Sequence, residues 1–364
     1  MLKLASVLFG VLASYQVYQT LNTLDYFNNT ELQSTEKCFT IKTPKGPEDI
    51  QVIGRLAISG FDDRLSLYED DSKGPLLTPN GGIIAIDPLN QSYYELKLEN
   101  FPNDKQFHPL GLHIYNNKTL YVINYDYKSG GDKVEVFSIH EKGDKLGLKH
   151  QVTVNFRENW MGQLNDLWVV GEKEFYATVW QPFPDPTTGR DHSLLTTLKR
   201  FAYFLFWKNT PLLHCKIAEK EAFCEPVDYG FMFNGITSDG KVLYVVDTLA
   251  GHISRYQLKE GLHRLDPIFT GFKNDNIEYD PKSKSLFASA IRLKDYLWFL
   301  SDFKQGKFSV LPGGVVEVKP SLEVRKVIFQ GTHSGTSIGV PFENWVLMGS
   351  WHHDQVMVCP FESN

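Results

Sequence analysis

Side chains with oxygen donors recur where predicted β-hairpins begin in this 364-residue chain. Asn165 precedes an apolar run, a turn at 171–173 and a second β-rich run. Hairpins of the same layout follow Asn234 and the pair Asp275-Asn276. Gly, Asn, Asp and Pro between β-branched or aromatic runs predict turns, because these residues supply or preset the turn dihedrals. The sequence therefore repeats an oxygen donor at one position of the hairpin.

Five oxygen donors of this kind suit a hard metal ion. The set is Glu48, Asn165, Asn234, Asp275 and Asn276. Oxygen ligands in numbers above four, carried on loops, select calcium over zinc or copper. Two carboxylates neutralise a dication, and three amides can complete a cage with one open face. A single Asn or Asp at a strand start is more simply a turn cap, but the recurrence of the whole set favours a metal site.

A second group of oxygen donors adjoins the first. Asp49 and Asp166 are the chain neighbours of two predicted ligands. Successive side chains of an extended chain point in opposite directions, so these two carboxylates should face away from the first site. Together with the backbone carbonyl of Leu112, they predict a second, more buried calcium site. We therefore expect two calcium ions as cofactors.

Repeated hairpins at long, uneven intervals predict the blades of a β-propeller. The innermost strand of each blade then begins at a central channel, where the oxygen donors would meet. Six residues mark the blade openings: Glu48, Leu110, Asn165, Asn234, Asp275 and Thr336. No linker or low-complexity tract divides the chain, so we expect a single all-β domain, a six-bladed β-propeller, over residues 38–364.

One internal segment, residues 193–213, departs from the β pattern. Its apolar residues recur at helical spacing, with Lys199 and Arg200 between them. We expect an inserted amphipathic helix that packs on the face of the propeller. The alternative is a lid over the channel mouth that also contacts lipid, since amphipathic aromatic helices with basic flanks lie well in membrane interfaces.

Residues 1–37 form a hydrophobic N-terminal segment and a polar lead-in. One lysine precedes an apolar run, which is the anatomy of a cleaved secretory signal peptide. Tyr15, Tyr18 and Leu21 extend the apolar face without a clear cleavage site, so a retained N-terminal hydrophobic helix that anchors the chain is the alternative. Both interpretations place the protein outside the cell or in the endomembrane system. The formal net charge of −6, with no basic run, argues against nucleic acid as a partner.

The cysteines and glycosylation sequons agree with an oxidising compartment. Four cysteines allow three pairings: Cys38, Cys215, Cys224 and Cys359. A bond between the first and the last would close the ring of blades, whereas the middle two could pair across a hairpin. A zinc site is the competing interpretation, but no CxxC and no nearby His pair supports it. Sequons for N-glycosylation begin at Asn28, Asn90 and Asn117.

Five short motifs, taken in order, resemble one known family. They are Gly46-Pro47-Glu48-Asp49, Leu164-Asn165-Asp166, Phe233-Asn234-Gly235-Ile236, Asp247-Thr248-Leu249-Ala250 and Asp275-Asn276-Ile277. The set is similar to the paraoxonase/arylesterase family, and the resemblance runs from about Cys38 to Cys359. It implies a secreted six-bladed propeller with one catalytic and one structural calcium ion that hydrolyses esters and lactones.

The resemblance also implies roles for particular residues. The catalytic calcium would be held by the five-residue set that begins with Glu48. The structural calcium would be held by Asp49, Asp166 and the Leu112 carbonyl. Cys38 and Cys359 would form the ring-closing disulfide. The family often retains its N-terminal hydrophobic stretch, which favours an anchor here.

Two positions depart from the family pattern. Animal members carry a catalytic histidine in an Asn-Pro-His-Gly motif, whereas the matching run 108–111 is His-Pro-Leu-Gly, with Leu110 in place of that histidine. The second histidine, which supports the first, falls at Tyr125. Three other histidines could be recruited: His113, His352 and His353. A histidine in a strand is, however, more often a packed or exposed residue than a base.

We therefore predict an arylesterase-like, calcium-dependent hydrolase of carboxylic esters or lactones with weak activity. The ion would polarise the carbonyl oxygen, and Glu48, Tyr125 or the metal alone would activate the attacking water. The alternative is an inactive, calcium-stabilised propeller that binds a hydrophobic ligand or a membrane surface. A strictosidine-synthase-like propeller is a third option, but that family does not share this ligand set.

Overall fold

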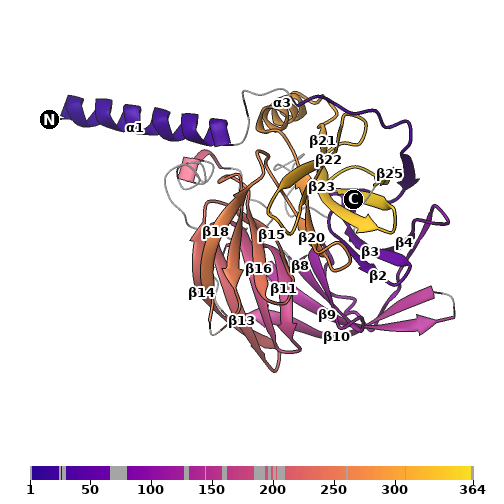
Figure 1. Cartoon of the computed structure of the whole chain (residues 1–364). Helices are drawn as coiled ribbons and strands as arrows, with labels where there is room; N and C mark the ends of the chain where they lie inside the picture. The colour runs from indigo at the N-terminus through magenta and orange to yellow at the C-terminus, as the bar shows by residue number, and fades with distance from the viewer. Residues whose placement is uncertain are drawn as a thin grey trace.

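Six antiparallel four-stranded blades surround a common axis in the described part of the chain (Figure 1). The computed structural model describes residues 2–23, 26, 30–65, 80–126, 131–143, 145–157, 162–183, 193–195, 198–199, 202, 210–259, 261–307 and 309–361. Four blades are separate sheets, and the other two are joined into one nine-stranded sheet. The innermost strands contact one another in chain order, and the last contacts the first, so the ring is closed. The predicted six-bladed β-propeller is confirmed.

The first three blades run from the inner to the outer strand in chain order. Blade 1 contains β2 (Ile50–Ile53), β3 (Leu56–Phe61), β4 (Gly82–Asp87) and β5 (Ser92–Glu95). Blade 2 contains β7 (Pro109–Tyr115), β8 (Thr119–Asp126), β9 (Gly131–Lys142) and β10 (Lys145–Phe156). Blade 3 contains β11 (Gln163–Gly171), β12 (Glu174–Gln181), β13 (Thr210–Ala218) and β14 (Glu221–Gly230).

Blades 4 and 5 repeat this order, and blade 6 takes its outer strand from the start of the fold. Blade 4 contains β15 (Phe233–Ser238), β16 (Val242–Asp247), β17 (His252–Gln257) and β18 (His263–Phe269). Blade 5 contains β19 (Ile277–Asp280), β20 (Ser285–Ala290), β21 (Gly313–Val318) and β22 (Val324–Gln330). Blade 6 contains β23 (Thr336–Phe342), β24 (Trp345–Ser350), β25 (Gln355–Pro360) and β1 (Phe39–Lys42).

Blade 6 closes the ring by joining the two ends of the propeller. Strand β1 pairs with β25 over four residues, from Phe39 opposite Val358 to Lys42 opposite Gln355. Immediately before β1, a disulfide joins Cys38 to Cys359 across 321 residues of sequence. A second disulfide joins Cys215 to Cys224, which face each other in the β13–β14 hairpin. Both pairings are those that the sequence allowed for a closed ring and a hairpin.

The outer edges of blades 2 and 3 protect each other. Asn155 and Phe156 of β10 pair in parallel with Glu221 and Ala222 of β14. The short strand β6 (Leu98–Glu99) pairs with an earlier part of β10. An outer strand with unpaired backbone groups is a template for association with other chains, and this pairing removes part of that edge.

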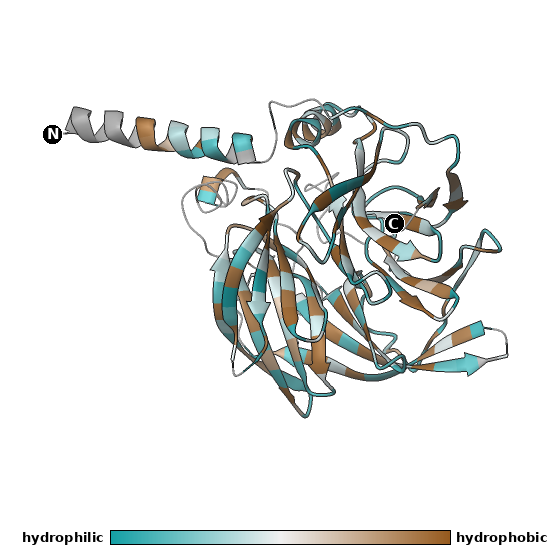
Figure 2. Ribbon diagram, in the orientation of Figure 1, coloured by the Kyte–Doolittle hydropathy of each residue, from teal (hydrophilic) through white to brown (hydrophobic). Residues whose placement is uncertain are grey.

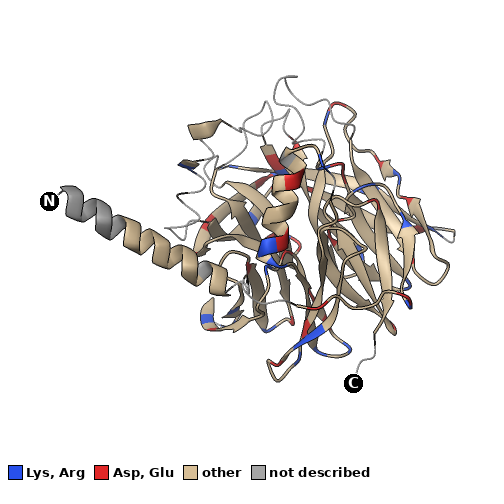
Figure 3. Cartoon of the chain, turned by 90° about the horizontal axis from the view of Figure 1, so that it is seen from above, with Lys and Arg blue, Asp and Glu red and all other residues tan. Residues whose placement is uncertain are grey.

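Apolar side chains fill the spaces between neighbouring blades. Brown apolar positions alternate with teal polar ones along the strands in Figure 2. One core cluster joins Tyr121 and Ile123 of blade 2 to Leu167 and Phe175 of blade 3. Other clusters join blade 1 to blade 2, blade 4 to blade 5 and blade 6 to blade 1. The positions of acidic residues (red) and basic residues (blue) are interspersed along the ribbon in Figure 3.

Two helices lie outside the sheets. The N-terminal helix α1 (Leu2–Thr23) projects from the propeller, whereas α3 (Leu293–Lys304) packs on it (Figure 1). Phe299 of α3 contacts Ile291 and Leu311 in a small apolar cluster. Within the described residues, no helix has both the length and the apolar content needed to cross a bilayer. The division of the chain between residues 37 and 38 stays a prediction.

The prediction that the inserted helix of residues 193–213 extends to its last four residues is wrong. Residues 194–195, 198–199 and 202 are helical, but 210–213 open strand β13. Residues 196–197, 200–201 and 203–209 lie outside the described part, so the inserted helix itself stays a prediction. A short apolar run such as Leu212-Leu213 reads equally well as helix or buried strand, and here both residues are fully buried in the sheet.

The two disulfides should differ in their effect on stability. The Cys38–Cys359 bond spans 321 residues and the Cys215–Cys224 bond spans 9. Chain-entropy loss in the unfolded state makes the longer closure about 3 kcal/mol more stabilising. We expect Cys38→Ser/Cys359→Ser to lower the urea midpoint far more than Cys215→Ser/Cys224→Ser. Equal losses in the two double variants would contradict the ring-closing role.

Candidate metal centre

The predicted oxygen donors all lie at the starts of inner strands. Asn165 and Asn234 are the third residue of β11 and the second of β15. Glu48 and Asp275 each stand two residues before an inner strand, β2 and β19. Because every inner strand begins at the same end of the propeller, these side chains lie around one mouth of the axis. The blade openings read from the sequence match the inner strands of the structure.

Two glycines let the inner strands approach closely at this ring. A Cβ atom on Gly111 of β7 would lie 2.5 Å from the Asn165 carbonyl oxygen and 2.5 Å from Asp166 Oδ1. A Cβ atom on Gly235 of β15 would lie 2.5 Å from Asn276 Cα. Any larger residue would push blade 2 from blade 3, or blade 4 from blade 5. The glycines therefore set how tightly the oxygen donors gather.

Hydrogen bonds connect the predicted metal ligands of different blades. The amide Nδ2 of Asn276 donates to Glu48 Oε1 at 2.7 Å. The hydroxyl of Ser337 donates to the backbone carbonyl of Glu48 at 2.5 Å. The side chains of Asn234 and Asp275 also share a hydrogen bond. Blades 1, 4, 5 and 6 thus meet through these residues.

Four of the five predicted ligands present a buried oxygen that has no hydrogen-bond partner among the described residues. These atoms are Glu48 Oε2, Asn165 Oδ1, Asn234 Oδ1 and Asn276 Oδ1. All four residues are at most 6% exposed. Leaving a buried polar atom unsatisfied costs about 1–3 kcal/mol, so four in one ring require a compensating partner. A hard cation bound by oxygen would be such a partner.

Burial also places an excess of negative charge at this centre. Burial raises the pKa of Glu48 to about 8, and the nearby charges of Asp275 and Asp49 add to the rise. Burial likewise raises the pKa of Asp275, against the opposing effect of Lys273. A bound cation would favour the ionised carboxylates and reverse this tendency. The chemistry of the donor set therefore fits a divalent cation.

Carboxylates alone do not form this centre. Within the described residues, no three His, Cys, Asp or Glu side chains are grouped so that they could hold a metal ion by themselves. A cation here would need the amide oxygens of Asn165, Asn234 and Asn276. This requirement favours calcium, which accepts carboxylate and amide oxygens together, over zinc.

The second predicted group, Asp49 and Asp166, faces neighbouring inner strands. Asp49 Oδ2 accepts a hydrogen bond from the Leu112 backbone N–H at 2.8 Å, and Asp166 Oδ2 accepts one from the Ile236 N–H at 2.9 Å. Burial raises the pKa of Asp49 to about 7, and burial together with the nearby Asp49 charge raises the pKa of Asp166 well above its ordinary value. It is the N–H of Leu112 that contacts Asp49, so a role for its carbonyl stays a prediction. Glu278, whose pKa is raised by burial and then by the Asp49 charge, adds a third acid.

Two cations near the centre were not expected from the sequence. Arg64 is buried, and its guanidinium donates to the Gly46 carbonyl at 2.7 Å and to the Pro109 carbonyl at 2.5 Å. Lys273 is also buried, with its ammonium 4.4 Å from the Tyr296 ring centroid. Burial lowers the pKa of Lys273, and the charge of Asp275 opposes that shift. Their position in the chain was the one sequence signal for these cations. Arg64 and Lys273 each follow a strand that returns to the end of the propeller where the inner strands begin.

The two residues at the positions of the family's histidine pair have structural roles. Leu110 is buried in the core between blades 2 and 3. The hydroxyl of Tyr125 donates to the Leu164 carbonyl and accepts from Trp180 Nε1, the latter at 2.9 Å. With its proton committed to a backbone carbonyl, Tyr125 is poorly placed to activate water.

The three histidines that the sequence offered as substitutes are not poised as bases. Burial lowers the pKa of His113 to about 3, and its Nδ1 accepts from the Val169 N–H at 3.2 Å. Burial lowers the pKa of His352 to about 3 as well, with His353 adding to the shift. The pKa of His353 is lowered by burial too. A base that resists protonation so strongly is a weak proton acceptor near neutral pH.

A family model described as Arylesterase matches residues 76–312, which is more than half of the chain. The chain belongs to the arylesterase family. It is 26% identical over 281 residues to human serum paraoxonase/arylesterase 1, covering 74% of this chain and 73% of that protein. It is also 26% identical over 298 residues to the mouse protein of the same name, covering 78% of each. The family prediction made from the sequence is confirmed.

Solved propellers share the fold of this arylesterase-family chain. A gluconolactonase from Xanthomonas campestris superposes with a TM-score of 0.53 at 12% identity, covering 89% of each chain. A luciferin-regenerating enzyme gives a TM-score of 0.51 at 11% identity, covering 90% of this chain and 97% of that one. At these identities the likeness shows the architecture alone.

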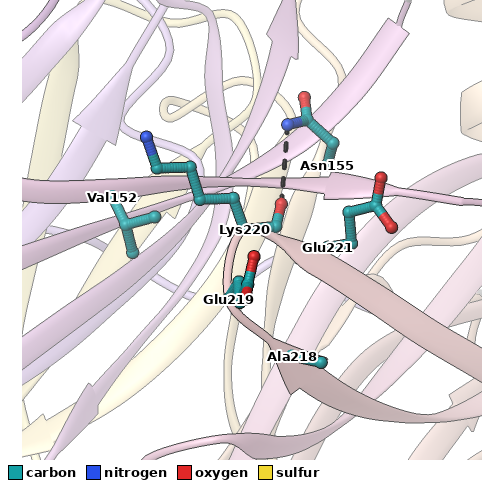
Figure 4. Close-up of a pocket in the computed structure, with 6 residues that line it drawn as sticks. All are labelled: Val152, Asn155, Ala218, Glu219, Lys220 and Glu221. Atoms are coloured by element: carbon teal, nitrogen blue, oxygen red, sulfur yellow. Dashed lines mark hydrogen bonds between the residues drawn. The ribbon is translucent and has the colours of Figure 1, made fainter.

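A hollow on the outer rim is separate from the candidate metal centre. It has a volume of about 500 Å³ and lies where β10 and β14 meet (Figure 4). The side chain of Asn155 donates to the Lys220 carbonyl at 3.5 Å across it.

Two predicted glycosylation sites, Asn90 and Asn117, are exposed in turns between strands, and Asn28 lies outside the described residues. Their glycosylation stays a prediction.

Without a bound cation, the protein should lose stability as pH rises. The folded pKa values of Glu48 and Asp49, about 8 and about 7, lie above the ordinary values of 4.5 and 3.8. The folded state therefore holds more protons than the unfolded state between about pH 4 and 8, so the free energy of unfolding falls across that range. Urea denaturation in excess EDTA at several pH values measures this free energy. In Glu48→Gln, the free energy of unfolding should depend less on pH. A stability that rises from pH 5 to 8 in EDTA would contradict this electrostatic account.

Proposed function

We propose that this arylesterase-family protein is a secreted or endomembrane calcium-dependent hydrolase of carboxylic esters or lactones. The proposal rests on four buried oxygens at inner-strand starts, from Glu48, Asn165, Asn234 and Asn276, for which the described part of the chain supplies no hydrogen-bond partner. Family membership supports ester hydrolysis as the reaction class. The two disulfides support an oxidising compartment.

The residues would divide the work between two groups. Glu48, Asn165, Asn234, Asp275 and Asn276 would hold the catalytic calcium, and Asp49, Asp166 and the Leu112 carbonyl would hold the structural one. When bound, calcium supplies a Lewis acid for a carbonyl oxygen and positive charge for the buried carboxylates. The Asn276–Glu48 hydrogen bond engages Glu48 Oε1, whereas Oε2 has no partner among the described residues and would be available to the ion. Gly111 and Gly235 keep the blades close enough for the donors to act together.

One observation favours the alternative, a calcium-stabilised propeller that binds a hydrophobic ligand or membrane surface without turnover. Leu110 and Tyr125 replace the family's histidine pair with core packing and a structural hydrogen bond. The metal centre would serve both proposals, because a ligand that binds the folded state stabilises it whether or not chemistry follows. Turnover is therefore the property that separates them.

Calcium should stabilise the wild type but not an Asn165→Leu variant. No described residue donates a hydrogen bond to Asn165 Oδ1, so replacing Asn165 should leave the free energy of unfolding in EDTA nearly unchanged. At a calcium concentration 100-fold above Kd, binding should add about 2.7 kcal/mol to the wild type, measured by urea denaturation. The variant should lose this increment.

Asn124 provides the matched control for that experiment. It is also a buried asparagine, but its oxygen accepts from the His108 N–H and its nitrogen donates to the Gln106 carbonyl. Asn124→Leu should lower stability by the same amount with and without calcium. An Asn165→Leu protein that gains as much from calcium as the wild type would refute the assignment of Asn165.

Hydrolysis should depend on the same residues. The purified wild type with calcium should turn over activated aryl esters and lactones, followed spectrophotometrically, and dialysis against EDTA should abolish the activity. The Asn165→Ala/Asp275→Ala variant should be inactive because two ligands are removed. Full turnover in EDTA would rule out the calcium-dependent mechanism. Equal inactivity of wild type and variant, with binding to lipid vesicles retained, would support the alternative.

A further inference from the structure

A buried histidine–carboxylate pair lies at the start of the inner strand β7, at the end of the propeller that carries the predicted ligands. His108 Nδ1 is 3.2 Å from both carboxylate oxygens of Asp62, and the two residues are only 1% and 3% exposed. His108 immediately precedes the inner strand β7, and Asp62 follows β3. A histidine that donates its Nδ1–H to a carboxylate keeps Nε2 as its proton-accepting nitrogen, and the carboxylate stabilises the imidazolium that forms.

The backbone on both sides of His108 is held in place. Its N–H donates to Asn124 Oδ1 at 2.8 Å, and its carbonyl accepts from the Tyr125 N–H at 3.1 Å. Asn124 is fixed in turn, because its Nδ2 donates to Glu135 Oε1 at 3.1 Å. The imidazole of His108 therefore has a defined position before any substrate binds, which a proton-transfer group requires.

Arg64 connects this pair to the metal centre. Its guanidinium spans the carbonyls of Gly46, two residues before Glu48, and of Pro109, which follows His108. Its backbone N–H donates to the Asp62 carbonyl at 2.9 Å. The Arg64 charge also lowers the pKa of Glu48 against the effect of burial. Among the described residues, these contacts link His108 to the charged groups of Asp62 and, through the Pro109 carbonyl, of Arg64, with Glu135 reached through Asn124.

The other histidine–carboxylate pairs in the described residues lie away from the inner strands. His150 Nε2 is 2.9 Å from Glu135 Oε2, and His214 Nε2 is 2.7 Å from Glu174 Oε1. His150 belongs to β10, the outermost strand of blade 2, and His214 belongs to β13 of blade 3. The pair at the start of an inner strand is the one formed by His108 and Asp62.

We propose that His108 accepts the proton of the attacking water during ester or lactone hydrolysis, with Asp62 as its positioning residue. The inference rests on the proposed function. A water O–H bond breaks as its oxygen bonds to the carbonyl carbon, and the proton passes to His108 Nε2. The acyl C–O bond then breaks, and the same proton passes to the departing alkoxide, giving the acid and the alcohol. His108 would thereby take over the task of the histidine that Leu110 has replaced.

The test compares His108→Asn, Asp62→Asn and His214→Gln with the wild type, all with calcium bound. His108→Asn installs the residue that the family motif carries at this position, so the fold should tolerate it. Removing a positioned base lowers kcat by about 10²–10⁴-fold. We expect such a loss of kcat in His108→Asn. The decrease of the hydrolysis rate toward acid pH, expected for the wild type, should disappear in this variant. Asp62→Asn should lower kcat and shift the pH at which the rate decreases, whereas His214→Gln should change neither kcat nor the pH profile.

Stability measured alongside separates proton transfer from structural support. Under the proposal, calcium raises the urea midpoint of His108→Asn as much as that of the wild type. Loss of this increment, or an unchanged pH profile and kcat in His108→Asn, would overturn the proposal for His108 while wild-type turnover still supports the hydrolase. No turnover by the wild type on any ester or lactone would overturn both.

Discussion

The structure depends on the burial of oxygen atoms that no hydrogen-bond donor within the described ranges satisfies. Glu48, Asn165, Asn234 and Asn276 bring such atoms to the inner-strand starts of four blades. In water each atom would be solvated, and in the folded protein each needs a partner of equal strength. A hard cation can satisfy all of them at once and can neutralise the carboxylates beside them. This single requirement links ring closure, blade spacing and the proposed chemistry.

The rest of the fold can be understood as the means of keeping these oxygens together. Closure by β1 and the Cys38–Cys359 disulfide fixes the circumference of the ring. Gly111 and Gly235 set the distance between neighbouring blades near the ring. Apolar clusters between blades resist any expansion, because they would lose buried contacts. The amide oxygens matter as much as the carboxylates, since a ring of acids alone would repel itself.

The sequence predicted the blades well because turn chemistry is local. Asn, Asp, Gly and Pro preset their own dihedrals, so Asn165, Asn234 and Asp275 marked blade openings without knowledge of the tertiary structure. Contacts made by the loops that follow each second strand could not be predicted in this way. Asp62 and Arg64 reach the centre only because β3 returns to the end where β2 begins. The end of the 193–213 helix failed for a related reason, since burial in a sheet outweighed helical spacing.

If the buried oxygens of Glu48, Asn165, Asn234 and Asn276 share one ion, that ion can be located directly. The most direct measurement is diffraction from crystals grown with calcium or soaked with a lanthanide, using anomalous scattering to locate the ion. We expect an anomalous peak bounded by Glu48, Asn165, Asn234 and Asn276, with oxygen ligands at about 2.3–2.6 Å for calcium. An ordered ring with no ion at saturating calcium, its oxygens bonded to water or to protein donors, would contradict it.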